Sequence, residues 1–111
     1  MRFAALRTFA LSLPEVVESP HHDFTSFRIR GKIFVTAPPP QDVIHVFVSE
    51  AVRERALVVH AGFAEKLLWG GKVVGLRIRL AAAEPATVKD LVRQAWLNKA
   101  PRSLHGSVGR S

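Results

Sequence analysis

Residues 24–37, Phe24-Thr-Ser-Phe-Arg-Ile-Arg-Gly-Lys-Ile-Phe-Val-Thr-Ala37, decide the fold of this chain. Apolar and polar side chains alternate before and after Gly31-Lys32, a pattern typical of two antiparallel strands joined by a tight turn. Glycine at the first central position predicts a type II′ turn, in which Gly31 has a positive φ. The stretch is therefore predicted to be a β-hairpin.

The predicted hairpin has two different faces. Its buried face pairs Ile29 with Phe34 and Phe27 with Thr36. Its outward face carries two basic and two apolar side chains, which are Arg28, Arg30, Ile33 and Val35. The same hairpin thus supplies a surface for the core and a basic, partly apolar outer surface.

Gly70-Gly71-Lys72 fits either a tight hairpin turn or a loop that binds phosphate. The eight-residue pattern of a phosphate-binding loop is absent, so a second hairpin is predicted here. Residues 63–69 before this turn fit a helical turn or a strand. Residues 73–80 alternate as a strand. Its core side is predicted to carry Val74, Leu76, Ile78 and Leu80, and its outer side Val73, Gly75, Arg77 and Arg79.

The remaining segments predict three helices and one more strand. Apolar residues at helical spacing indicate helices over residues 3–13, ended by Pro14, and over residues 88–96. Thr87 and Asp90 resemble a capping box for the last helix, with Pro85 upstream as a start signal. Ser49 is expected to cap a short helix. Residues 42–48 form a strand whose core side carries Ile44, Val46 and Val48, and whose outer side carries Val43, His45 and Phe47.

The predicted element order is α-β-β-β-α-β-β-α, with residues 15–23 as a connector or a short edge strand. This order favours a two-layer α+β domain, an antiparallel sheet with helices on one face. Residues 1–104 are expected to form a single domain, and residues 105–111, rich in Gly and Ser, a flexible C-terminal tail. The core is expected to bring together Phe27, Phe34, Leu76, Ile78, Leu91 and Trp96.

Composition narrows the class of protein. The 111 residues contain no cysteine, which excludes disulfides, thiolate metal sites and a cysteine nucleophile. No run of 18 apolar residues occurs, so no membrane span is expected, and residues 1–13 lack the cleavage site of a signal peptide. We expect a cytoplasmic protein.

Positive charge is concentrated in the second half of the chain. The net charge is +7, and residues 66–111 hold nine Lys and Arg against two Asp and Glu. Such a balance serves solubility or the binding of a polyanion. His21, His22 and Asp23 are adjacent on an extended segment, so they point to alternate faces and predict neither a metal site nor a cofactor site.

Four segments resemble the MmcQ/YjbR family: Leu13-Pro14-Glu15, residues 26–34 (Ser-Phe-Arg-Ile-Arg-Gly-Lys-Ile-Phe), residues 74–78 (Val-Gly-Leu-Arg-Ile) and residues 95–104. The resemblance spans nearly the whole chain. It implies a bacterial protein with a fold like that of secretion chaperones, a DNA-binding label and no enzymatic activity. The chain departs from the family where Val73 replaces a common tryptophan and Arg102-Ser103 a more basic pair.

Two functions are therefore expected of the outer sheet face. The first is a non-enzymatic DNA-binding module that contacts the phosphates of duplex DNA or another polyanion through Arg28, Arg30, Lys32, Lys72, Arg77 and Arg79, with Phe47 as a stacking surface. The second is a protein-interaction or chaperone-like homodimer that uses an apolar patch of Ile33, Val35, Val43, Phe47 and Val73. No catalytic motif is present in the sequence, so no enzyme is predicted.

Overall fold

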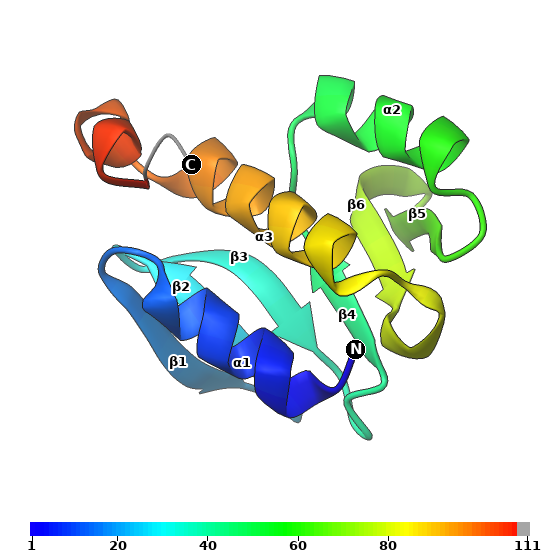
Figure 1. Cartoon of the computed structure of the whole chain (residues 1–111), viewed down its shortest axis with the longest axis horizontal. Coiled ribbons are helices and arrows are strands. Elements are labelled where there is room, and N and C mark those ends of the chain that lie inside the picture. The colour runs from blue at the N-terminus through cyan, green and yellow to red at the C-terminus, as the bar shows by residue number, and fades with distance from the viewer. Residues whose placement is uncertain (109–111) are drawn as a thin grey trace.

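The computed structural model describes residues 1–108 and has an α+β fold with two layers (Figure 1). One layer is a six-stranded antiparallel sheet with the order β1-β2-β3-β4-β6-β5. The strands are β1 (Val16–His21), β2 (Phe24–Ile29), β3 (Lys32–Ala37), β4 (Val43–Val46), β5 (Ala64–Trp69) and β6 (Lys72–Arg79). The other layer contains α1 (Phe3–Ser12), α2 (Glu50–Val59) and α3 (Pro85–Lys99). The predicted fold class is confirmed.

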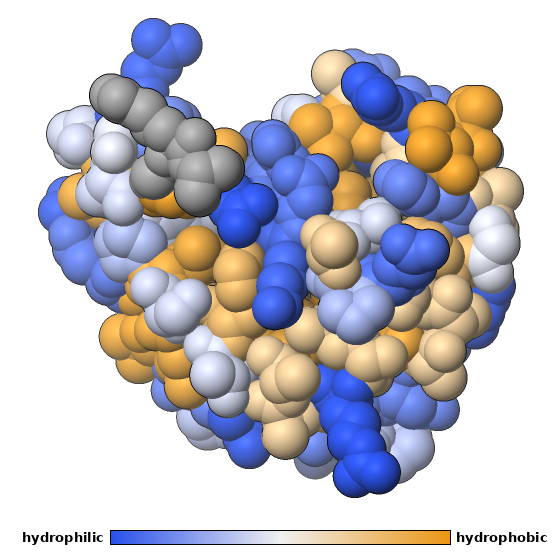
Figure 2. Space-filling model, viewed as in Figure 1, coloured by the Kyte–Doolittle hydropathy of each residue, from blue (hydrophilic) through white to orange (hydrophobic). Residues whose placement is uncertain are grey.

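Two segments that the sequence left open are strands. Residues 16–21 form β1, which pairs with β2 at the edge of the sheet, so the sheet has six strands and not five. Residues 64–69 form β5, the opposite edge. The side of the sheet away from the helices is called the outer face below. Figure 2 shows the helix side, on which hydrophilic and hydrophobic residues are interspersed.

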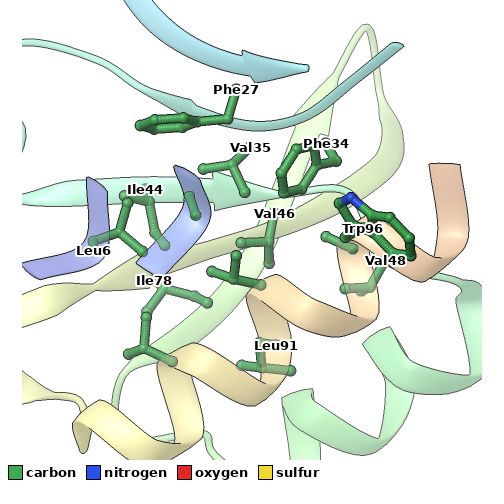
Figure 3. Packing of buried hydrophobic residues seen from close by; sticks show 14 of the residues in the cluster. Leu6, Phe27, Phe34, Val35, Ile44, Val46, Val48, Ile78, Leu91 and Trp96 are labelled. Atoms are coloured by element: carbon green, nitrogen blue, oxygen red, sulfur yellow. The ribbon is translucent and has the colours of Figure 1, made fainter. Parts of the chain in front are cut away.

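The core lies between the sheet and the helices, as Figure 3 shows. The six predicted core residues are all at most 3% exposed, which confirms that prediction. Trp96 is fully buried, and its indole N–H donates to the carbonyl oxygen of Pro14 over 3.1 Å. That bond satisfies the one polar atom of the ring and joins α3 to the end of α1.

The first hairpin turn differs from the predicted type. Strand pairing continues to Ile29 and Lys32, so Arg30 and Gly31 are the central residues. Both have positive φ, +49° and +80°, which defines a type I′ turn and not the predicted type II′. The predicted positive φ of Gly31 is confirmed.

A β-bulge near this turn changes the faces of β3. Phe27 lies opposite Val35 and Arg28 opposite Ile33, so Phe34 is the extra residue. The bulge turns Val35 to the core side, where it is fully buried. The predicted placement of Val35 on the outer face is therefore wrong, and Thr36 lies on the outer face opposite Ser26 rather than in the core.

A second bulge lies in β6. Leu67 pairs with Gly75 and Leu68 with Val73, which leaves Val74 as the extra residue. Since Leu67 and Leu68 point to opposite sides of β5, Val73 lies on the side away from Gly75 and Arg77. The predicted outer placement of Val73 is wrong for the same physical reason, a one-residue shift of the alternation.

The helix ends follow the sequence signals in part. The hydroxyl of Ser49 accepts from the backbone N–H of Val52 over 3.3 Å, which confirms the predicted cap of α2. Helix α3 begins at Pro85 with Glu84 at the N-cap, three residues before the predicted capping residue Thr87. Proline at the first helical position is preorganised for the helix, and it sets the start here.

The chain after α3 is ordered further than predicted. Residues 102–108 form a 3₁₀ helix, where a flexible tail was predicted from residue 105. Leu104 and Val108 pack against the core, and His105 lies within hydrogen-bond distance of the carbonyl oxygen of Ala100, 3.0 Å. The rest of the predicted tail, residues 109–111, lies outside the described residues.

Candidate functional site

The outer face of the sheet contains a groove of about 480 Å³, here called the outer groove. Apolar and aromatic side chains from β2, β3, β5 and the end of β4 line it, namely Phe24, Ile33, Phe47 and Trp69. Thr36 adds a hydroxyl, and His21, His22 and Lys99 add basic groups. The groove is thus an aromatic surface bordered by groups that can carry positive charge.

Two aromatic rings are held together in the outer groove. The ring centroids of Phe47 and Trp69 are 5.6 Å apart, with 55° between the planes. Phe47 is 9% exposed, whereas Trp69 is 52% exposed, so Phe47 fixes the position of a ring that remains open to solvent. Gly75 makes room for Phe47, because a Cβ built at Gly75 would lie 3.3 Å from a ring carbon.

Lys99 reaches the groove from the other layer. Lys99 is the last residue of α3, and Phe47, which also lines the groove, directly follows the end of β4. The side-chain amide of Asn98 donates to the carbonyl oxygen of Phe47 over 2.9 Å. This bond joins the end of α3 to the segment that supplies Phe47, so the helix end that carries Lys99 is held at the groove.

A row of polar residues crosses the outer face of the sheet and includes Thr36 of the groove. Directly opposed residues of neighbouring strands share a face, and the row runs through Ser26, Thr36, His45, Arg77 and Glu65. The predicted outer placement of His45 and Arg77 agrees with this register.

His45 is the buried titratable group of the row. Thr36 Oγ1 lies 3.1 Å from His45 Nδ1, and the ring of Phe24 stands edge-on to the imidazole at 6.0 Å. Burial, followed by the positive charge of Arg77, lowers the pKa of His45 below the ordinary histidine value of 6.5. The imidazole is therefore neutral at pH 7 and supplies a hydrogen bond rather than a charge.

The four predicted arginines do not form one continuous surface. Arg28 and Arg30 belong to β2 and its turn, and Arg77 and Arg79 to β6. The strands β3 and β4 lie between them, which separates the pairs by about 14 Å at the usual spacing of strands.

Each of these arginines also has an acceptor within its own region. Arg28 donates to Ser26 Oγ, and Arg30 donates to both carboxylate oxygens of Glu15. Arg77 donates to Glu65 over 2.6 Å, and Arg79 to the carbonyl oxygen of Gly62 over 2.6 Å. The two ion pairs among these contacts, Arg30–Glu15 and Arg77–Glu65, are about half exposed and individually weak.

The other predicted site residues are dispersed. Lys32 and Lys72 are exposed and stand just after the two hairpin turns. Of the predicted apolar patch, Ile33 and Phe47 line the outer groove, Val43 is 7% exposed, and Val35 and Val73 are on the helix side as described above. The outer groove therefore contains part of the predicted apolar patch and none of the predicted basic residues.

Six of the eight groove residues were absent from the predicted site, namely His21, His22, Phe24, Thr36, Trp69 and Lys99. Trp69 lies in a segment whose strand character was open, Phe24 at the start of the first hairpin, and Lys99 on a helix in the other layer. An aromatic residue directly before the Gly70-Gly71 turn was the available signal for Trp69, since a residue flanking a tight turn belongs to the strand.

The described part of the chain contains neither a metal cluster nor a membrane span. Within residues 1–108, no group of three or more His, Cys, Asp or Glu side chains is placed to hold a metal ion. None of the described helices has the length and apolar character needed to cross a membrane.

Comparison with known proteins gives a match at the level of fold. The structure is similar to Deinococcus radiodurans protein DR2400, a protein with a DUF419 domain, with a TM-score of 0.74 and 16% sequence identity. The match covers 97% of this chain and 88% of that protein. No family model matches the sequence, and no curated protein matches it. The similarity shows the fold.

Proposed function

We propose that this chain is a non-enzymatic binding module that takes single-stranded nucleic acid in the outer groove. The observation that supports the proposal is the aromatic groove itself, in which the half-exposed ring of Trp69 packs against Phe47 and Lys99 lines the same groove. Proteins that bind single strands combine such stacking surfaces with positive charge.

Membership of the MmcQ/YjbR family is part of this proposal. The residues of the first hairpin resemble that family, and the structurally similar DR2400 carries a DUF419 domain, which belongs to it. The DNA-binding label of the family is consistent with a nucleic-acid ligand.

The groove favours a single strand over a duplex. Bases in a duplex are stacked on one another and cannot reach the groove, whereas unpaired bases are free to stack on an aromatic side chain. Duplex binding was expected to use six basic side chains, but the four arginines among them lie in two separated pairs. A stacking mode needs fewer phosphate contacts, and Lys99 with the histidines at the edge of the groove supplies them.

Fluorescence anisotropy of a labelled single-stranded oligonucleotide tests this function. Stacking of one base contributes about 1–3 kcal/mol, so Trp69→Ala should weaken binding roughly 5- to 150-fold. Leu11→Ala is the matched control, since Leu11 is a comparably exposed apolar residue, on α1 in the helix layer. The proposal fails if no oligonucleotide binds at low salt, or if both variants bind as the parent does.

Salt dependence distinguishes the proposal from its alternatives. Each charged contact to a single-strand phosphate contributes about −0.7 to the log–log slope, and Lys99 supplies one such contact. Lys99→Ala should make this slope less steep by about 0.7, whereas Lys89→Ala, elsewhere on α3, should leave it unchanged.

A second candidate function is the binding of a protein partner in the same groove. The apolar side chains of Ile33, Phe47 and Trp69 support it, because they suit an aromatic or aliphatic side chain of a peptide. Such binding would respond little to salt and would also be weakened by Trp69→Ala.

A further inference from the structure

The two edges of the sheet differ in how far they are protected. At the β1 edge, Pro20 lies within the strand, and its carbonyl oxygen accepts from Arg28. Glu18 on the same strand forms a bidentate ion pair with Arg7 of α1, in which both nitrogen–oxygen distances are 3.0 Å. Proline, charge and an adjoining helix are the usual means by which proteins protect an edge strand from pairing.

The β5 edge has no proline and carries large apolar side chains. Leu68 and Trp69 are 56% and 52% exposed. The helix packed on this strand, α2, exposes Val58 and Val59 at 80% and 58%, and Figure 2 shows hydrophobic residues over α2. Four of the six large hydrophobic residues that are exposed in the described chain thus belong to β5 and α2.

Backbone groups of β5 also point away from the sheet. The N–H of Arg79 donates to the carbonyl oxygen of Phe63, so Phe63 and alternate residues after it direct their backbone groups toward β6. By the same alternation, Lys66 and Leu68 direct their N–H and C=O groups outward. Another extended strand can pair with these groups.

We propose that β5 pairs antiparallel with β5 of a second copy of this chain, about a two-fold axis at Leu67. Residues opposite each other across such a pair must share a face, and hydrogen-bonded pairs must both point outward. These conditions place Lys66 opposite Leu68 of the second copy, and Leu68 opposite Lys66. Each of these pairs exchanges two backbone hydrogen bonds.

Charge and the length of paired strand select this register, and its self-complementarity points to a second copy as the occupant. Two neighbouring registers also satisfy the alternation. One sets Lys66 opposite Lys66, where like charges repel. The other is centred on Leu68 and pairs only residues 67–69 of β5, whereas the Leu67-centred register pairs residues 65–69. In the Leu67-centred register, the aliphatic stem of Lys66 packs on Leu68, and Glu65 lies opposite Trp69. The strand is therefore complementary to itself, as an interface with two-fold symmetry requires. The two sheets become continuous, and both outer grooves lie on the same face of the dimer.

Sedimentation velocity of the full chain without nucleic acid tests this interface. The parent should show a concentration-dependent shift from monomer to dimer. Leu68→Lys should abolish the dimer, because it sets lysines opposite each other twice. The double variant Lys66→Glu/Leu68→Lys should restore the dimer, because each opposed pair then carries opposite charges. Val17→Lys is the matched control: Val17 is 60% exposed on β1, the other edge strand, and should leave the dimer unchanged.

Two results would overturn the proposal. One is a parent protein that stays monomeric up to about 1 mM, the weak end of specific association. The other is a Lys66→Glu/Leu68→Lys variant that is folded by circular dichroism and remains monomeric. The dimer is independent of the proposed binding function, since sedimentation is measured without a ligand and oligonucleotide binding is measured per chain.

Discussion

Gly75→Ala tests how much stability depends on the close approach of β4 and β6 next to Phe47 of the outer groove. A Cβ at this position would lie 2.6 Å from the carbonyl oxygen of Val46 and 3.3 Å from the ring of Phe47. The backbone oxygen cannot rotate away, so the two strands must move apart locally. Overpacking of this kind costs up to about 3 kcal/mol, and the lower entropy of the unfolded alanine chain returns less than about 1 kcal/mol. We expect a net loss of about 2 kcal/mol.

Urea and thermal unfolding measure this loss. For a domain of about 100 residues, about 2 kcal/mol corresponds to a decrease in Tm of roughly 10 °C. Gly62→Ala is the matched control, because a Cβ added at Gly62 would meet no atom within 4 Å and its φ is not positive. The control should stay within about 0.5 kcal/mol of the parent. Equal stabilities for Gly75→Ala and Gly62→Ala would refute the reasoning.

Three further changes have defined outcomes. Gly31→Val should cost more than about 1 kcal/mol through its φ of +80°, whereas Gly106→Val, without a positive φ, should cost less; equal melting temperatures would exclude the strain. Phe34→Ala should cost roughly 3–5 kcal/mol in urea unfolding, because the ring is fully buried, and a loss below about 1 kcal/mol would contradict its core position. The lowered pKa of His45 means that the unfolded chain binds the proton more tightly than the folded chain. The free energy of unfolding is therefore unaffected by this group above about pH 7 and decreases as pH falls below 6.5. His45→Gln should remove this decline between about pH 7.5 and 5, and His22→Gln, an exposed control, should retain it.

Periodic segments of the sequence were enough to predict the layers of the fold. The stripe of Val88, Leu91, Val92, Ala95 and Trp96 is buried as predicted, since a helix of this length keeps its period without interruption. The sequence left residues 15–23 open between a connector and a short edge strand. Pro20 and its polar neighbours interrupt the alternation of apolar and polar residues that would have indicated β1.

The candidate site was harder to predict than the core. Alternation within a strand correctly placed Arg28 and Arg77 on the outer face, but it does not determine which strands are neighbours. The sheet order inserts β3 and β4 between them, and this order depends on long-range pairing. Lys99 joins the groove from the helix layer, a contact that no local pattern encodes.

The two β-bulges explain both the errors of facing and the shape of the groove. Each inserts one residue, Phe34 in β3 and Val74 in β6, a few residues after a turn whose central residues both have positive φ. A bulge reverses the alternation beyond it, which moved Val35 and Val73 to the helix side. It also increases the local twist of its hairpin. Ile33 and Trp69 come from these two twisted hairpins and line the groove together with Phe47 of the segment between them. The same irregularities that a strict period of two cannot predict therefore produce the concave aromatic surface on which the proposed function depends.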